Sequence, residues 1–224
     1  MKLFERVFGS KKDAAELRKD RVIARLIDEA VPSNDFLPPH IAVGEDIRRS
    51  EEEIVTRLLG AMISAVKGET RDDELIAKVI AQYGAEDCFT PEERAFIDTP
   101  EPSDEACVKF AWRYEGVYVL MWALGFFDTL PYPTDIVHVP DMGKLMSRLG
   151  REGLLAEARL RPQDDILNAA ELAYRYNWAA TNARMNNRPA PSNLDAGVVY
   201  ERHYAFNWLV GYGKQSWDTI STDT

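Results

Sequence analysis

The stretch Val198-Val-Tyr-Glu-Arg-His-Tyr-Ala-Phe-Asn-Trp-Leu209 decides the fold class of this chain. It is apolar and aromatic apart from Glu201, Arg202, His203 and Asn207. A helix that is apolar on nearly all sides has to be buried by its neighbours, so we expect a central helix over residues 196–210. Because burying a polar group alone costs several kcal/mol, the polar side chains in it must be paired or take part in chemistry.

Two other segments have the same character and are expected to pack beside this helix. Residues 104–124 are apolar almost all round beyond Val108, and residues 164–183 are so beyond Ile166. If the three helices pack together, their arginines meet a matching set of glutamates, which gives near charge balance. The charged residues concerned are Arg113, Glu115, Glu171, Arg175, Glu201 and Arg202.

Helix caps and helix breakers predict the remaining helices. Residues 14–31 are amphipathic and are followed by a proline-rich linker. Thr90-Pro-Glu-Glu93 is typical of a capping box with proline at the first helical position, and it predicts a short helix to Ile97. Similar signals predict a helix over 45–67 that is ended by Gly68. They also predict a helix over 72–83, with Thr70 as N-cap and Gly84 as C-cap, and a helix from 104 onward that is capped by Ser103.

The sequence therefore predicts a mainly α fold. We expect a compact, single all-α domain of several helices over residues 45–224, with an N-terminal helical extension and Pro-rich linker over residues 1–44. At most one or two short strands are expected, and the β-prone run Ile136-Val-His-Val139 is a candidate for one. The periodicity shows neither an internal repeat nor the alternation that a large sheet requires.

Composition argues against several classes of function. The 224 residues are 46% hydrophobic and carry a net charge of −10, with a pI near 4.9. Such an acidic surface repels phosphate backbones, so we expect no nucleic-acid partner. Cys88 and Cys107 are not arranged in a paired motif, so we read them as free thiols of a cytoplasmic protein. The longest apolar run, residues 116–127, is too short to span a bilayer.

Sequence motifs for common catalytic centres are absent. The chain has neither a nucleophile elbow, GxSxG, nor a phosphate loop, GxxxxGK[ST]. Histidine occurs only at positions 40, 138 and 203, and no HExxH is present. On a helix Glu201 and His203 diverge by about 200° and cannot bind one ion together. We therefore predict no metal and no cofactor.

The polar cluster leaves two hypotheses open. As an ion-pair network it would fix the register of the helices, and the protein would be a non-enzymatic domain acting through protein–protein contacts, with its cluster dry and away from the largest pocket. Alternatively, its arginines bind an anionic ligand, and the protein is an enzyme or a small-ligand binder. The candidate residues are Arg113, Glu115, Arg175, Glu201, Arg202, His203 and Asn207.

The N-terminus supports a second alternative. Residues 1–12 place Met1, Phe4, Val7 and Phe8 on one helical face beside basic residues. That pattern is typical of a short interfacial anchor and predicts weak contact with an anionic membrane surface.

Several motifs in the same order resemble one bacterial family. They are Trp112-Arg-Tyr-Glu115 with Leu120-Met-Trp-Ala-Leu-Gly125, Asp165-Ile-Leu167 leading to Tyr174-Arg-Tyr-Asn-Trp178, the stretch 198–209, and the closing Trp217-Asp-Thr-Ile-Ser-Thr-Asp-Thr224. The family is domain of unknown function 4272, and the resemblance covers about residues 45–224. It implies a bacterial, mostly helical domain and supplies no reaction and no catalytic residue.

Overall fold

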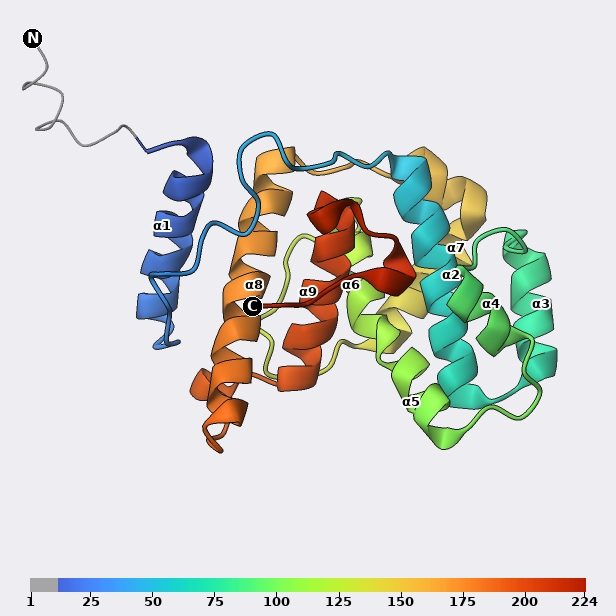
Figure 1. Cartoon of the computed structure of the whole chain (residues 1–224). Coiled ribbons are helices and arrows are strands. Elements are labelled where there is room, and N and C mark those ends of the chain that lie inside the picture. Colours follow the sequence, from blue (N-terminus) through green and yellow to red (C-terminus); the bar gives the residue numbers. More distant parts are fainter. Residues whose placement is uncertain (1–11) are drawn as a thin grey trace, which may run out of the picture.

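Helix α9 lies in the middle of a row of helices (Figure 1). In the computed structural model, which describes residues 12–224, α9 (Ala196–Val210) packs between α8 (Gln163–Met185) and α6 (Arg113–Ala123). Within residues 198–210 every side chain except Tyr200 is buried. The prediction of a central helix with these bounds is therefore confirmed.

The row extends to both sides of this centre (Figure 1). Beyond α8 lies α1 (Ala14–Asp28), and beyond α6 lies α2 (Glu51–Thr70). Four further helices pack around α2: α3 (Asp73–Tyr83), α4 (Pro91–Ile97), α5 (Asp104–Ala111) and α7 (Val139–Glu157). Short 3-10 turns occur at Pro191–Asn193, Tyr212–Lys214 and Trp217–Thr219. The mainly α class is confirmed.

The apolar core is divided between the two sides of α8. The main cluster joins α2, α6 and α9 through side chains such as Ile63, Leu120 and Phe206. A smaller cluster lies between α1 and α8 and includes Val22, Leu26 and Tyr176. The first helix is thus attached to the body by its own set of contacts.

Local capping chemistry accounts for most helix starts. Thr90 and Glu93 form the predicted capping box of α4, and Ser103 caps α5. A second capping box, made by Ser50 and Glu53, starts α2 at residue 51 rather than at 45. Asp72, not the predicted Thr70, caps α3, because its carboxylate accepts from the backbone N–H of Leu75.

Gly68 does not end α2, as the sequence predicted; the helix continues to Thr70. Its role is to allow a close approach of α5. A Cβ at this position would lie 2.5 Å from the carbonyl oxygen of Cys107 and 2.8 Å from the backbone nitrogen of Ala111. The glycine therefore serves packing rather than termination.

The expected continuous helix over 104–124 is divided at Trp112. There the backbone tightens, and the N–H of Glu115 donates to the carbonyl oxygen of Trp112, three residues back, at 3.2 Å. The two parts pack differently, because α5 contacts α2 whereas α6 contacts both α2 and α9.

Residues 136–139 form no strand, and the part of the chain that the structure describes holds none. The N–H of Val137 instead donates to the Glu115 carboxylate at 2.6 Å, and Val139 begins α7. No helix was predicted to begin at Val139. Proline is tolerated in the first turn of a helix, where its missing N–H costs nothing.

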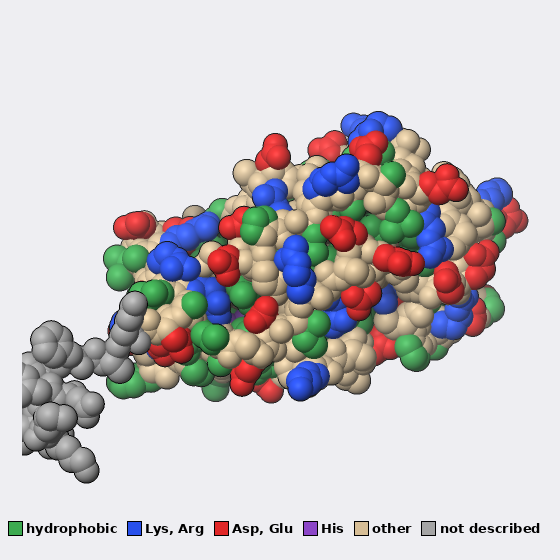
Figure 2. Space-filling view, turned by 90° about the horizontal axis from the view of Figure 1, so that it is seen from above, with side chains coloured by type: hydrophobic (Ala, Val, Ile, Leu, Met, Phe, Trp, Pro, Cys, Tyr) green, Lys and Arg blue, Asp and Glu red, His purple; other side chains and the backbone are tan. Residues whose placement is uncertain are grey.

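Surface charge is mixed in sign over the face shown in Figure 2, where Lys and Arg side chains are interspersed with Asp and Glu. Cys88 and Cys107 are both buried free thiols, as the sequence predicted. The predicted membrane anchor at residues 1–12 lies, but for Lys12, outside the described residues.

Candidate functional site

Two of the expected ion pairs cross the interface between α6 and α9. Arg113 Nη1 lies 2.9 Å from Glu201 Oε2, and Arg202 Nε lies 3.0 Å from Glu115 Oε2. All four side chains are buried. Each helix contributes one arginine and one glutamate, so the two pairs fix the register of α6 against α9.

The third pair lies elsewhere. Glu171 and Arg175 are one turn apart on α8 and pair at 2.7 Å. They face the loop between α1 and α2: the backbone N–H of His40 donates to Glu171 at 2.7 Å, and Arg175 donates to the carbonyl oxygen of Pro38 at 3.2 Å. The three arginines thus each meet a glutamate, as the sequence indicated, but in two separate places.

Burial controls the proton affinity of the carboxylates in the α6–α9 pairs. It raises the pKa of Glu115 and of Glu201 above the usual range, and the neighbouring guanidinium groups of Arg202 and Arg113 oppose that rise. The positive partners therefore favour the charged carboxylates in an apolar setting.

His203 and Asn207 share a face of α9 and point to a residue that the sequence analysis did not select, His40. His40 Nε2 lies 2.8 Å from Asn207 Oδ1, and the His40 and His203 rings are 5.4 Å apart. His40 is stacked between Tyr174, at 4.7 Å, and Tyr212, at 5.0 Å. His40 follows Pro38 and Pro39 in a loop, where no helical pattern of apolar residues can indicate burial. The apolar residue Ile41 beside it is the one local sign that His40 is buried.

Four other buried charges, Arg18, Arg57, Lys67 and Glu93, were not predicted from the sequence. Arg18 of α1 lies 3.8 Å from Glu171 and donates to the carbonyl oxygen of Ile41. Arg57 of α2 pairs with Glu93, the capping residue of α4. Each of these residues lies in a helix that also carries exposed charges, so composition does not distinguish it.

The C-terminal tail crosses α9 toward α8 (Figure 1). Asn207 Nδ2 donates to the carbonyl oxygen of Ser221 at 2.7 Å, and Asn177 Nδ2 donates to that of Thr222 at 3.1 Å. Trp217 is buried. The tail is therefore part of the packed structure.

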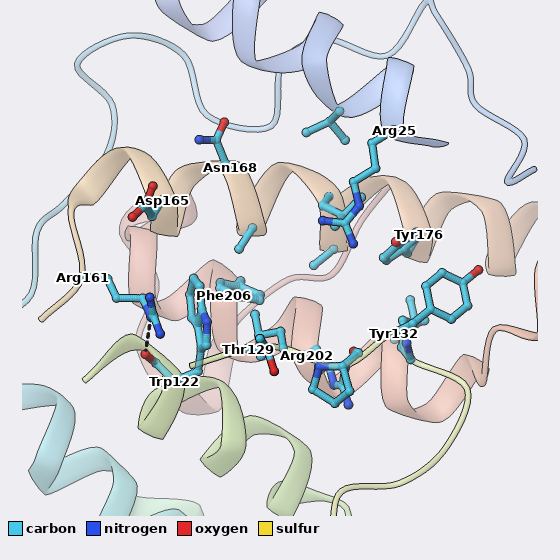
Figure 3. Close-up of a pocket in the computed structure, with 18 of the residues that line it drawn as sticks. Arg25, Trp122, Thr129, Tyr132, Arg161, Asp165, Asn168, Tyr176, Arg202 and Phe206 are labelled. Carbon is cyan, nitrogen blue, oxygen red and sulfur yellow. Dashed lines mark hydrogen bonds between the residues drawn. The ribbon is translucent and has the colours of Figure 1, made fainter. Parts of the chain in front are cut away.

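A cavity of about 520 Å³ opens between α1, α8, α9 and the segment 128–133 (Figure 3). Arg25 extends toward it from α1, while Trp122, Phe206 and Arg202 lie on the opposite side (Figure 3). Arg161 is fixed at one end, where it donates to the carbonyl oxygen of Trp122 at 2.8 Å (Figure 3). The charged residues that line the cavity are Arg21, Arg25, Arg161, Arg202, Asp128 and Asp165.

Arg202 connects this cavity to the buried pairs. Its Nε donates to Glu115 at 3.0 Å and its Nη1 donates to the carbonyl oxygen of Pro131 at 2.6 Å. Its Nη2 is buried and has no hydrogen-bond partner among residues 12–224. Two of its nitrogens therefore hold the guanidinium in place, and the third has hydrogen-bond donors without a partner among the described residues.

Two other predicted site residues border different hollows. Glu201 lines a cavity of about 680 Å³ beside the C-terminal tail, and Glu115 lines one of about 300 Å³ near Ile136 and Val137. The lining of these three cavities does not include the remaining candidates, which are Arg113, Arg175, His203 and Asn207.

Residues 12–224 contain no group of three or more His, Cys, Asp or Glu side chains placed to hold a metal ion. Among the same residues, no helix has the length and apolar character needed to cross a membrane.

The model of the family described as domain of unknown function (DUF4272) matches residues 18–220. The match begins within α1, earlier than the resemblance expected at about residue 45, so most of the first helix is included. No match was found among curated proteins or among solved structures.

Proposed function

The chain belongs to this family, whose description states no activity, and we propose that it binds a small anionic ligand with an apolar body in the 520 Å³ cavity. This is the ligand-binding alternative among the functions considered from the sequence. A single observation carries it: Arg202 lines the cavity, and its buried Nη2 has no hydrogen-bond partner among the described residues. Leaving such a donor unpaired costs free energy, which a ligand oxygen would recover.

The other lining residues fit the same chemistry. Trp122, Phe206 and Leu172 provide apolar surface, and four arginines face two aspartates. A basic cavity on an acidic protein concentrates anions locally. Its volume lies within the range of about 300–1,000 Å³ that is typical of small-molecule sites.

The positions of Glu201 and Arg202 also support ligand binding. Protein–protein contact as the main function predicted a cluster away from the largest pocket, whereas Glu201 lines the cavity of about 680 Å³ and Arg202 the cavity of about 520 Å³. We place the binding activity in the bacterial cytoplasm, in keeping with two buried free thiols.

Binding can be tested by calorimetry with benzoate and phenyl phosphate as anionic probes and benzamide as the neutral one. We expect the anions to bind and benzamide to bind at least tenfold more weakly, a difference of about 1.4 kcal/mol. Replacing the two exposed arginines at the mouth, Arg21→Ala with Arg25→Ala, should weaken anion binding without unfolding the protein.

Arg148→Ala is the matched control, because Arg148 is exposed and pairs with Glu157 away from the cavity. Equal binding of benzoate and benzamide, or equal loss of affinity in both variants, would contradict the proposal. Arg202→Met removes the central donor, and its folding is checked first by circular dichroism because it leaves Glu115 buried without its partner.

Protein–protein contact is the second proposal, and the groove of about 300 Å³ supports it. Val108 and Ile136 line this groove and are 57% and 68% exposed. An apolar side chain of a partner would fit there. Ile136→Glu should abolish retention of such a partner on the immobilised protein, whereas Arg21→Ala should not.

A further inference from the structure

His40 and His203 form a buried pair that the proposed ligand site does not use. Three of their four ring nitrogens, His40 Nδ1 and both nitrogens of His203, have no hydrogen-bond partner among the described residues. A neutral imidazole already leaves a donor or an acceptor unpaired in such a place. A second proton would add a buried, unpaired donor together with a charge.

The charged groups around His40 do not compensate a positive ring. Arg18 approaches from α1 and Arg175 from α8, and both are positive. Among the described residues, Glu171 of α8 is the carboxylate that contacts His40, through the His40 backbone N–H, and it already accepts from Arg175 and lies near Arg18. The remaining neighbours are uncharged: Tyr174 of α8, His203 and Asn207 of α9, and Tyr212.

The two histidines differ in how easily their side chains can move from the core to solvent. His203 lies in the middle of α9, whereas His40 lies in the non-helical segment 29–50. Side chains from α8 and α1 contact the backbone of this segment: Arg175 donates to the carbonyl oxygen of Pro38 and Arg18 to that of Ile41. His40 is therefore the member of the pair that can move to solvent.

We propose that the His40–His203 pair is a proton-sensitive latch, in which protonation drives His40 out and loosens residues 37–41 together with α1, while α6 and α9 stay packed. The latch joins α1 to the body because Arg18 of α1 contacts both Ile41 and Glu171. One consequence rests on the proposed function: α1 supplies Arg21, Val22 and Arg25 to the cavity wall, so an open latch would expose the cavity.

The direction of the response follows from the proton affinities. Burial lowers the pKa of His40 to about 4, a shift that Arg18 and Arg175 reinforce and that the bond to Asn207 opposes. Burial and the neighbouring His40 also lower the pKa of His203. In the open form His40 returns toward its ordinary value of 6.5, so protons favour opening as the pH falls below that value.

Hydrogen exchange of the full chain at pH 7.5 and pH 5.0, corrected for the intrinsic rate, tests the latch. We expect exchange of residues 37–41 and of α1 to accelerate at least tenfold at pH 5.0, with little change in α6. His40→Gln, which keeps an amide able to donate to Asn207, should remove the acceleration. His138→Gln should retain it, because His138 is exposed.

Three results would overturn the latch. They are an unchanged acceleration in His40→Gln, acceleration of α6 in step with α1, and no acceleration down to pH 4.5. If His40→Gln does not fold, the NMR chemical shifts of the imidazole nitrogens, measured on the wild-type protein across the same pH range, test the latch instead. Acceleration that follows protonation of His40 supports the proposal, and acceleration while His40 stays neutral rejects it.

Discussion

Glu171 shows how one buried carboxylate can join three parts of the chain. It is fully buried on α8, yet Arg175 and the His40 backbone N–H donate to it, and Arg18 lies 3.8 Å away. A carboxylate can stay charged in such a place only because these groups replace its hydration. The residue therefore ties α8 to the loop and to α1.

Replacing this carboxylate should be costly. We expect Glu171→Gln to lower the free energy of unfolding by about 3–5 kcal/mol, because it leaves Arg175 buried without its counter-charge. Urea denaturation followed by tryptophan fluorescence measures the loss. Glu157→Gln, in the exposed pair with Arg148, is the control and should change stability by less than about 1 kcal/mol. Similar losses in the two variants would show that Glu171 is not organising this region.

The buried histidines also predict a pH dependence of global stability. In the unfolded chain each histidine has its ordinary pKa of 6.5. In the folded protein the pKa of His40 is about 4, and that of His203 is also lowered from 6.5. The histidine contribution is therefore complete above pH 6.5 and is lost as the pH falls toward 4, at up to about 1.4 kcal/mol per pH unit for each histidine.

Comparison with variants isolates this contribution from that of the carboxylates. Urea denaturation between pH 7 and pH 4.5 should show a shallower decline for His203→Leu than for the wild-type protein. His138→Leu should follow the wild-type slope, because His138 is exposed. Parallel slopes for all three proteins would mean that His203 titrates alike in both states.

At the scale of elements, the comparison of α2 with α7 shows why alanine in place of a helical glycine can have opposite effects at two positions. Gly68 lies against the backbone of α5, whereas a Cβ at Gly143 of α7 would meet nothing within 4 Å. Helix propensity alone favours alanine over glycine by about 1 kcal/mol at either place. Packing decides the sign at Gly68, because the clash is with backbone atoms that cannot turn aside.

Alanine substitutions at the two glycines should therefore diverge. We expect Gly68→Ala to lower the free energy of unfolding by about 1–3 kcal/mol through overpacking, and Gly143→Ala to raise it by up to about 1 kcal/mol. Thermal and urea denaturation of both variants measure the difference. A gain in stability from Gly68→Ala would show that α5 can move away from α2 at little cost.

At the scale of the whole molecule, the helices in the row differ in how much apolar surface they share with their neighbours. Helices α2, α6 and α9 share the main apolar cluster, and α1 contributes to the smaller one. The expected division of the chain into an extension over 1–44 and a domain over 45–224 remains a prediction. The family match from residue 18 and the contacts of Arg18 indicate that α1 nonetheless belongs with its neighbours.

Removing α1 tests that division. A chain that begins at Ser33 should keep the folded body but unfold at lower urea concentration, because Tyr176 and Glu171 lose their contacts with α1. A chain that begins at Lys12 keeps α1 and should match the full-length protein. Complete unfolding of the shorter chain, seen by circular dichroism, would contradict an independent domain over residues 45–224.

Much of the helical content followed from local signals. The bounds of α9, the capping box at Thr90 and the C-terminal glycine cap at Gly84 depend on residues a few positions apart. Predictions from local signals were wrong where tertiary packing determines the helix bounds. Helix α2 continues past Gly68, and the helix expected over 104–124 is divided at Trp112. Helix α7, which has a proline in its first turn, was not predicted.

The sequence by itself determined that three apolar helices would carry arginines and glutamates in balance, since charges within such segments must be neutralised when they are buried. Only the tertiary structure decided that Arg113 meets Glu201, that Arg202 meets Glu115, and that Arg202 lines a cavity while its Nη2 has no partner among residues 12–224. It also brought His40 to Asn207, 167 positions away. Periodicity and composition are local properties of a chain, whereas ion-pair partners, cavities and buried loops depend on which distant segments pack together.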